Sequence, residues 1–142
     1  MSSGGGERPA RALSEFLDAH PPWRERLRNT LDFSAVVTEL ERDANGMKPA
    51  QRQAEQLRQV AELARFLLAD VARVARMYQR TWQLDVSQPA ALTSARDLYR
   101  DLGDWDMVRR LAEHEAEAAT DPLHKARLTA LIGELLLDSS QP

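Results

Sequence analysis

The sequence predicts an all-α protein of 142 residues. Alanine and leucine are its commonest residues, whereas β-branched residues are scarce and include one isoleucine. Because strong helix formers dominate, a sheet has little to be built from. No segment alternates apolar and polar residues between hairpin turns, as a half-exposed strand would. We therefore expect antiparallel helical hairpins in a single domain over residues 10–142, which is an ordinary size for one core.

Turn-forming residues divide the first part of the chain. Residues 1–9 (MSSGGGERP) are small, polar and rich in glycine, so we expect a disordered lead-in there. The turn residues that follow leave short predicted helices, which span residues 11–19, 23–30 and 33–43. Asn45-Gly46 is expected to end the last of these in a left-handed conformation. Pro49 then begins the next helix, because proline is tolerated in a first helical turn.

Residues 50–87 contain neither glycine nor proline, and their apolar residues recur at helical spacing. Steps of three and four residues connect Leu57, Ala61, Ala64, Leu68, Val71, Ala75, Tyr78 and Trp82. One interpretation is a single long helix whose heptad seam pairs in a coiled coil. The other is a helical hairpin that turns near Leu68–Asp70, with Asp70 at the start of its second helix.

Three further helices are predicted over residues 89–101, 104–119 and 123–138. Pro89, Gly103 and Pro122 separate them, since these residue types interrupt helices. Asp104 is predicted to cap the middle helix, because its side chain can accept hydrogen bonds from unpaired N–H groups of the first turn.

The segment 95–122 contains an aromatic residue at Tyr99, a turn at Gly103-Asp104-Trp105 and an ending at Asp121-Pro122, and in these features it resembles a tetratricopeptide repeat. In that family an aromatic residue of the first helix precedes a Gly-Asp-aromatic turn, and a second helix with small and apolar residues ends at Asp-Pro. The matching residues here are Tyr99, Gly103, Asp104, Trp105, Val108, Ala112, Asp121 and Pro122. One family period of 34 residues earlier, Ala69 stands in place of Gly103, close to the turn considered within residues 50–87.

This resemblance implies a short solenoid of stacked helical hairpins, because a two-helix unit cannot bury its apolar face alone. Residues 123–138 would then form a C-terminal capping helix. The aromatic residue that follows the turn would be a core residue, so we expect Trp105 to pack against Leu98 and Leu102. Replacing Trp105 by alanine would on that basis cost about 3–5 kcal/mol.

The residue pattern points away from catalysis. The absence of cysteine excludes thiol chemistry, disulfides and cysteine-ligated metals. His20, His114 and His124 lie far apart or on different predicted elements, so no metal site is expected. Glutamates two residues apart, which point to different faces of a helix, occur at Glu113, Glu115 and Glu117. We predict a non-enzyme that needs no cofactor and no metal.

Charge and hydropathy argue against nucleic-acid partners and against membrane insertion. The formal net charge is −3, which excludes a wholly basic nucleic-acid binder, although Arg73, Arg76 and Arg80 form one helical stripe. No apolar run approaches the ~20 residues that span a bilayer, and no secretory signal is expected. We therefore expect a cytoplasmic protein, in a bacterial cell, with no nucleic-acid partner and no membrane insertion.

The repeat resemblance implies a binding module that holds a peptide or an amphipathic helix in a concave groove. The matching groove positions are Gln59, Leu63, Phe66, Thr93, Asp97 and Arg100. They lack the Lys/Asn/Arg set with which chaperone-binding members hold a C-terminal carboxylate, so a mixed peptide or amphipathic helix is favoured. The predicted function is therefore a protein-interaction scaffold or adaptor.

The last predicted helix offers a second candidate surface. Its leucines spread over more than one face, and no second helix of the hairpin follows, so some apolar surface is expected to stay exposed. Such a patch usually marks an interface, and we predict that Leu136 and Leu137 dock onto a partner protein or another copy. The alternative function is a homodimeric helical-bundle or coiled-coil assembly element.

Overall fold

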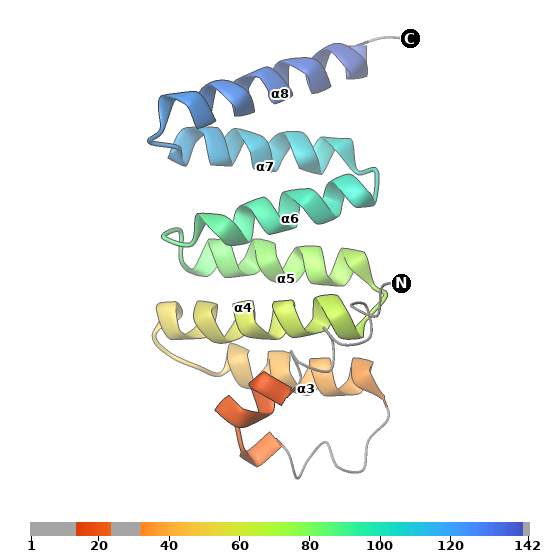
Figure 1. Cartoon of the computed structure of the whole chain (residues 1–142), viewed down its shortest axis with the longest axis vertical. Helices are drawn as coiled ribbons and strands as arrows, with labels where there is room; N and C mark the ends of the chain where they lie inside the picture. Colours follow the sequence, from red (N-terminus) through yellow and green to blue (C-terminus); the bar gives the residue numbers. More distant parts are fainter. Residues whose placement is uncertain (1–13, 24–31, 141–142) are drawn as a thin grey trace, which may run out of the picture. The chain divides into compact units, whose positions relative to one another are not determined.

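A computed structural model describes residues 14–23 and 32–140 (Figure 1). All regular elements within these ranges are helices, which confirms the predicted all-α class. None of the helices described there is long and apolar enough to cross a membrane. The chain divides into two compact units, Met1–Asp70 and Val71–Pro142. The single domain expected over residues 10–142 stays a prediction. The expected disordered lead-in and most of the helix predicted over residues 23–30 lie outside the described residues.

The first unit is built around two helices that pack on each other, α3 (Phe33–Asn45) and α4 (Ala50–Leu67). Residues 14–19 add a helical segment, as predicted for that part of the chain. Asp32 begins α3, because its side chain accepts a hydrogen bond from the Ala35 backbone N–H at 3.1 Å. The buried side chains of this unit include Phe16, Trp23, Val37, Leu40, Leu57, Val60 and Ala61.

The predicted left-handed end at Gly46 is wrong. Gly46 has φ −86°, in the right-handed region, and its N–H donates to the carbonyl oxygens of Arg42 and Asp43 at 3.2 Å. The Met47 N–H then donates to the Ala44 carbonyl at 3.0 Å. Since right-handed turns already engage these terminal carbonyl groups, the helix end needs no left-handed residue.

The apolar residues at helical spacing over residues 50–87 do not belong to a single helix. Helix α4 ends at Leu67, and α5 (Val71–Leu84) begins four residues later. Leu68 has extended backbone angles of φ −113° and ψ 146°, although its N–H still donates to the Ala64 carbonyl at 2.8 Å. The interruption falls at the predicted Leu68–Asp70, with the second helix starting one residue after Asp70. The single long helix is therefore wrong, and the hairpin arrangement stays a prediction.

The second unit stacks α5, α6 (Pro89–Asp101), α7 (Trp105–Ala118) and α8 (Pro122–Ser140) in chain order, each packed on the next (Figure 1). Gly103 connects α6 to α7 with φ 74°, a left-handed conformation that favours glycine. Asp104 caps α7 as predicted, accepting from the Met107 N–H at 3.2 Å. Buried side chains of this unit include Val74, Tyr78, Leu92, Ala95, Leu98, Val108, Leu111 and Ala112.

The prediction that Trp105 is a core residue is wrong. Its side chain is 52% exposed, and the expected neighbour Leu102 is 45% exposed, although Leu98 is buried. Trp105 is the first residue of α7. Side chains of a helix lean toward its N-terminus, so an indole at this position extends past the helix end. Val108, Leu111 and Ala112 make the buried contacts of α7 instead.

Candidate functional site

Helix α8 carries an exposed apolar surface. Leu128 is buried against Ala112 and Ala116 of α7, and Leu131 and Ile132 pack partly against the same cluster. Other leucines of α8 stay open to solvent, at exposed fractions of 58% for Leu123, 48% for Leu136 and 66% for Leu137. The predicted uncovered surface on the last helix is thus confirmed, with Leu136 and Leu137 part of it. We call Leu123, Leu136 and Leu137 the α8 leucines.

Two of the groove positions predicted in the first unit lie beside the chain's own helical segment of residues 14–19. Gln59 Oε1 lies 3.1 Å from the Nε2 atom of His20. Gln59 and Leu63 line a small pocket of about 150 Å³ together with Phe16. Leu63 is buried, so a partner has no access to its side chain, whereas Phe66 is 42% exposed.

The groove positions predicted in the second unit differ in what they contact. Thr93 is half-buried, and its hydroxyl lies 2.7 Å from Glu115 Oε1 and 3.4 Å from the Pro89 carbonyl. Asp97 and Arg100 form an ion pair within α6, with Arg100 Nη2 3.7 Å from Asp97 Oδ1. Arg100 is exposed. Of the three, Thr93 is the one that lines a pocket.

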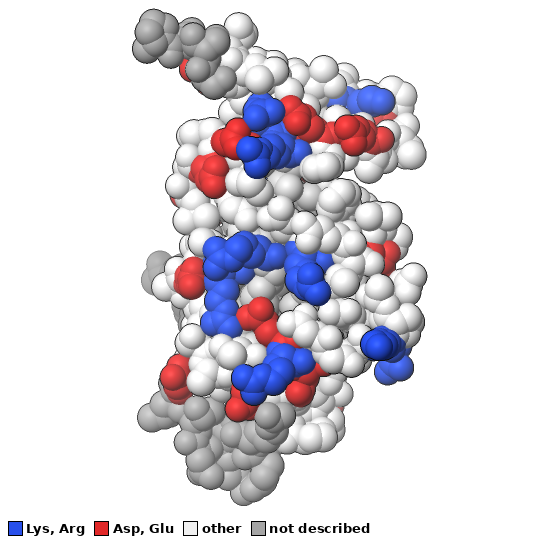
Figure 2. Space-filling model, turned by 180° about the vertical axis from the view of Figure 1, so that it is seen from behind, with Lys and Arg blue, Asp and Glu red and all other residues white. Residues whose placement is uncertain are grey.

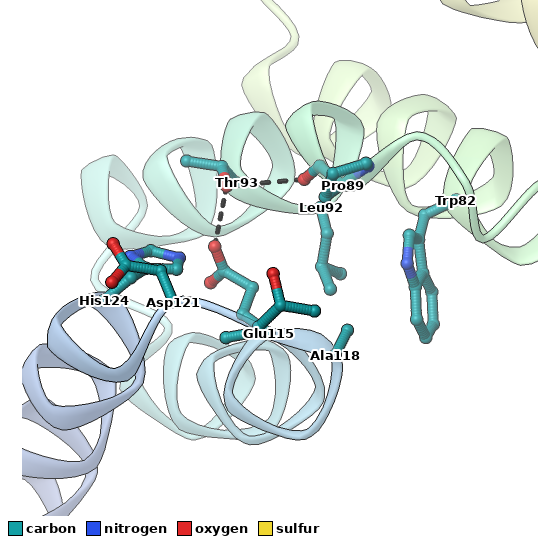
Figure 3. A pocket seen from close by; sticks show the side chains of 10 residues that line it. Trp82, Pro89, Leu92, Thr93, Glu115, Ala118, Asp121 and His124 are labelled. Atoms are coloured by element: carbon teal, nitrogen blue, oxygen red, sulfur yellow. Dashed lines mark hydrogen bonds between the residues drawn. The ribbon is translucent and has the colours of Figure 1, made fainter.

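This pocket lies where α5 and α7 end and α6 and α8 begin (Figure 3). Its volume is about 230 Å³. Ten residues line it, namely Trp82, Pro89, Leu92, Thr93, Glu115, Ala118, Ala119, Thr120, Asp121 and His124. We call it the α6–α8 pocket. Sequence reasoning assigned only Thr93 among these residues to a site, and it assigned Trp82 to helix packing.

Glu115 is the buried charge of this pocket. Its side chain is 3% exposed and forms an ion pair with Arg96, whose side chain is 14% exposed. The Thr93 hydroxyl donates to the same carboxylate at 2.7 Å. A buried carboxylate is tolerated when a cation and hydrogen-bond donors compensate it. The sequence could have indicated that Glu115 is buried, because it continues the helical spacing of the buried residues Val108, Leu111 and Ala112 along α7.

A second polar contact joins α5 to α6. The Tyr99 hydroxyl donates to Gln79 Oε1 at 2.9 Å. Burial raises the pKa of Tyr99 above its ordinary value, because the phenolate is poorly solvated there, while the positive charge of Arg76 acts in the opposite direction. This hydroxyl is therefore held as a neutral hydrogen-bond donor.

The charged surface carries both signs. Arg76 and Arg80 of the predicted arginine stripe are exposed, and Arg73 is half-buried. Figure 2 shows Lys and Arg side chains interspersed with Asp and Glu side chains. Among the described residues, no group of three or more His, Cys, Asp or Glu side chains is placed to hold a metal ion.

No protein-family model matches this chain, and comparisons with curated proteins and with solved structures give no significant match. The tetratricopeptide resemblance therefore depends on the motif of residues 95–122, and the functional argument depends on the surfaces described above.

Proposed function

We propose that the protein is a non-catalytic scaffold or adaptor that binds a peptide or helix of another protein, or a second copy of itself. The observation that carries this proposal is the exposure of the α8 leucines. Exposed apolar side chains that form a contiguous patch commonly mark an interaction site, and Leu136 and Leu137 are consecutive exposed residues of α8. Their burial by a partner would remove apolar surface from water, at about 25 cal/mol per Å².

Of the alternative, a homodimeric helical-bundle or coiled-coil assembly element, the coiled-coil form has less support. It depended on one uninterrupted helix over residues 50–87, and the chain interrupts that stripe between Leu67 and Val71. Self-association through α8 remains part of the adaptor proposal, since the same leucines can meet a second copy.

The test of this function compares the two candidate surfaces. The chain is immobilised and used to capture proteins from cell extract, each candidate is then purified, and binding is measured again with purified components. Sedimentation of the chain alone reports self-association. We expect Leu136→Glu/Leu137→Glu to abolish binding and Arg100→Glu to preserve it. The reverse pattern would transfer the site to the predicted groove, and a monomer that binds no purified partner would contradict an adaptor function.

We further propose that α4 and α5 form one hairpin of a short tetratricopeptide-like solenoid. The interruption at Leu68–Asp70 and the motif of residues 95–122 support it. Spin labels at the exposed positions Arg52 and Gln83 test this arrangement. A hairpin brings the two backbones to within roughly one to two helix spacings of about 10 Å, whereas a continuous helix would separate them by about 47 Å at 1.5 Å per residue.

A further inference from the structure

The α6–α8 pocket combines an apolar floor with acidic and aromatic groups at its sides. Figure 3 shows Trp82 on one side and Asp121 with His124 on the other, while Leu92, Glu115 and Ala118 lie between them. A volume of about 230 Å³ accommodates one long side chain rather than a folded element. The pocket is thus shaped for a single anchoring residue.

The charges of the lining favour a cation. Two carboxylates, Glu115 and Asp121, belong to the lining, and neither Lys nor Arg does. Arg96 and Thr93 already compensate Glu115. Asp121 is exposed, and its Oδ1 atom accepts from the Leu123 backbone N–H at 3.1 Å, which leaves its negative charge available to a ligand. Residues 91–142 carry 10 acidic and 6 basic side chains, which adds a net attraction for positive groups.

The remaining lining matches the other parts of a basic side chain. Arginine and lysine bury their methylene stems on apolar surface while the charged head stays with polar groups. Pro89 and Ala118, which are both exposed, supply that apolar surface. Trp82 lines the pocket and is half-buried, and its indole also contacts the His114 ring, with the ring centroids 5.2 Å apart. An indole face attracts cations. A planar guanidinium suits both an aromatic face and a carboxylate better than an ammonium group does.

We propose that the α6–α8 pocket holds an arginine side chain of a bound protein partner, with the guanidinium toward Asp121 and the stem across Pro89 and Ala118. This inference rests on the proposed adaptor function and deepens it. The α8 leucines then supply apolar contact and the pocket supplies selectivity for a basic residue. Asp121 directly precedes α8 and Leu123 is the second residue of that helix, so the pocket adjoins one of the α8 leucines.

The test uses a capped amino acid, Nα-acetyl-arginine methylamide, so that no natural partner is needed. Binding to the full chain is followed by the ¹H–¹⁵N signals of the Trp82 indole and of the backbone amides of residues 118–124. The matched probe is Nα-acetyl-citrulline methylamide, which has nearly the same shape but no charge. We expect saturable shifts with the arginine probe and at least tenfold weaker binding of the citrulline probe. The Trp105 indole signal should stay unchanged.

Two variants with the same change of net charge locate the interaction. Asp121→Asn removes the carboxylate of the pocket, and Asp101→Asn removes an exposed carboxylate at the other end of α6. We expect Asp121→Asn to weaken arginine binding at least fivefold and Asp101→Asn to leave it within twofold. Equal binding of the two probes, equal effects of the two variants, or no saturable shift at Trp82 would each overturn the proposal.

Failure of the arginine-binding proposal can be distinguished from failure of the adaptor proposal. Arginine binding that persists in Leu136→Glu/Leu137→Glu, in a chain that captures no protein, would support the pocket and contradict the adaptor function. Capture of a purified partner by a chain that does not bind the arginine probe would support the adaptor function and overturn the pocket.

Discussion

Helices α7 and α8 are neighbours in one unit, yet they distribute their apolar residues differently. Helix α7 gathers Val108, Leu111 and Ala112 on a buried stripe and packs against both α6 and α8. Its outer side carries ion pairs of Arg109 with Asp106 and Glu113, each at 2.8 Å. Helix α8 buries one apolar side chain, Leu128, among those described, and packs mainly on α7.

The apolar residues of the two helices therefore have different environments. On α7 the apolar residues serve folding, because they are removed from water within the unit. On α8 Leu123, Leu136 and Leu137 are exposed, so their side chains contribute less to folding than buried ones do. The proposal of a binding surface on α8 therefore depends on the exposure of these leucines rather than on hydropathy alone.

The largest expected effect concerns the buried ion pair between α6 and α7. Arg96→Met leaves the Glu115 carboxylate buried without its cation, and we expect a loss of about 3–5 kcal/mol in the free energy of unfolding. The matched control is Arg110→Met, because Arg110 pairs with Asp106 at 3.0 Å on the surface. Such exposed pairs contribute about 0–1 kcal/mol. Urea unfolding measures both, and similar losses would contradict the difference in burial.

The next effect compares two leucines of α8 itself. Leu128→Ala is expected to cost about 2–5 kcal/mol, as other truncations of buried leucine do. Leu137→Ala is expected to cost less than about 1 kcal/mol, because its side chain is mostly exposed already. Urea unfolding monitored by circular dichroism distinguishes the two values. Equal destabilisation would show that Leu137 belongs to the folded core.

A smaller effect is expected at the start of α7. Trp105→Ala should cost about 1 kcal/mol, since the half-exposed indole loses only part of the contact that a buried one would lose. Thermal unfolding gives the change, with Trp105→Phe as the control that preserves an aromatic ring. A loss near the ~3–5 kcal/mol of a buried tryptophan would restore the core assignment drawn from the repeat motif.

The smallest effect is a pH dependence from Tyr99. Its folded pKa is raised above the unfolded value of 10.0, chiefly because burial disfavours the phenolate. The stability contribution is therefore fully present below pH 10 and is lost as the pH rises through the folded pKa. We expect Tyr99→Phe to remove this dependence, at a cost of about 1 kcal/mol for the hydrogen bond to Gln79. Unchanged alkaline unfolding in the variant would contradict it.

Much of the fold was predictable because local chemistry determines where these helices begin and end. Pro89 and Asp104 were assigned to helix starts from their residue types, and both occupy those positions. The buried pair was not predicted, because Arg96 and Glu115 lie 19 residues apart and meet only through helix packing. The exposure of Trp105 also depends on tertiary packing. The repeat motif predicted that Trp105 follows the turn before α7. Because Trp105 is the first residue of that helix, its side chain is half exposed.

The central claim is that the α8 leucines serve binding rather than folding. The most direct measurement is the dissociation constant of Leu136→Glu/Leu137→Glu for the purified partner, or for a second copy where the chain self-associates. The predicted result is at least 30-fold weaker binding, about 2 kcal/mol, with helix content unchanged. Thr129→Glu/Ala130→Glu, at exposed positions of the same helix, should stay within about threefold, as near-neutral peripheral changes do. Binding of the leucine variant at wild-type strength would contradict the claim.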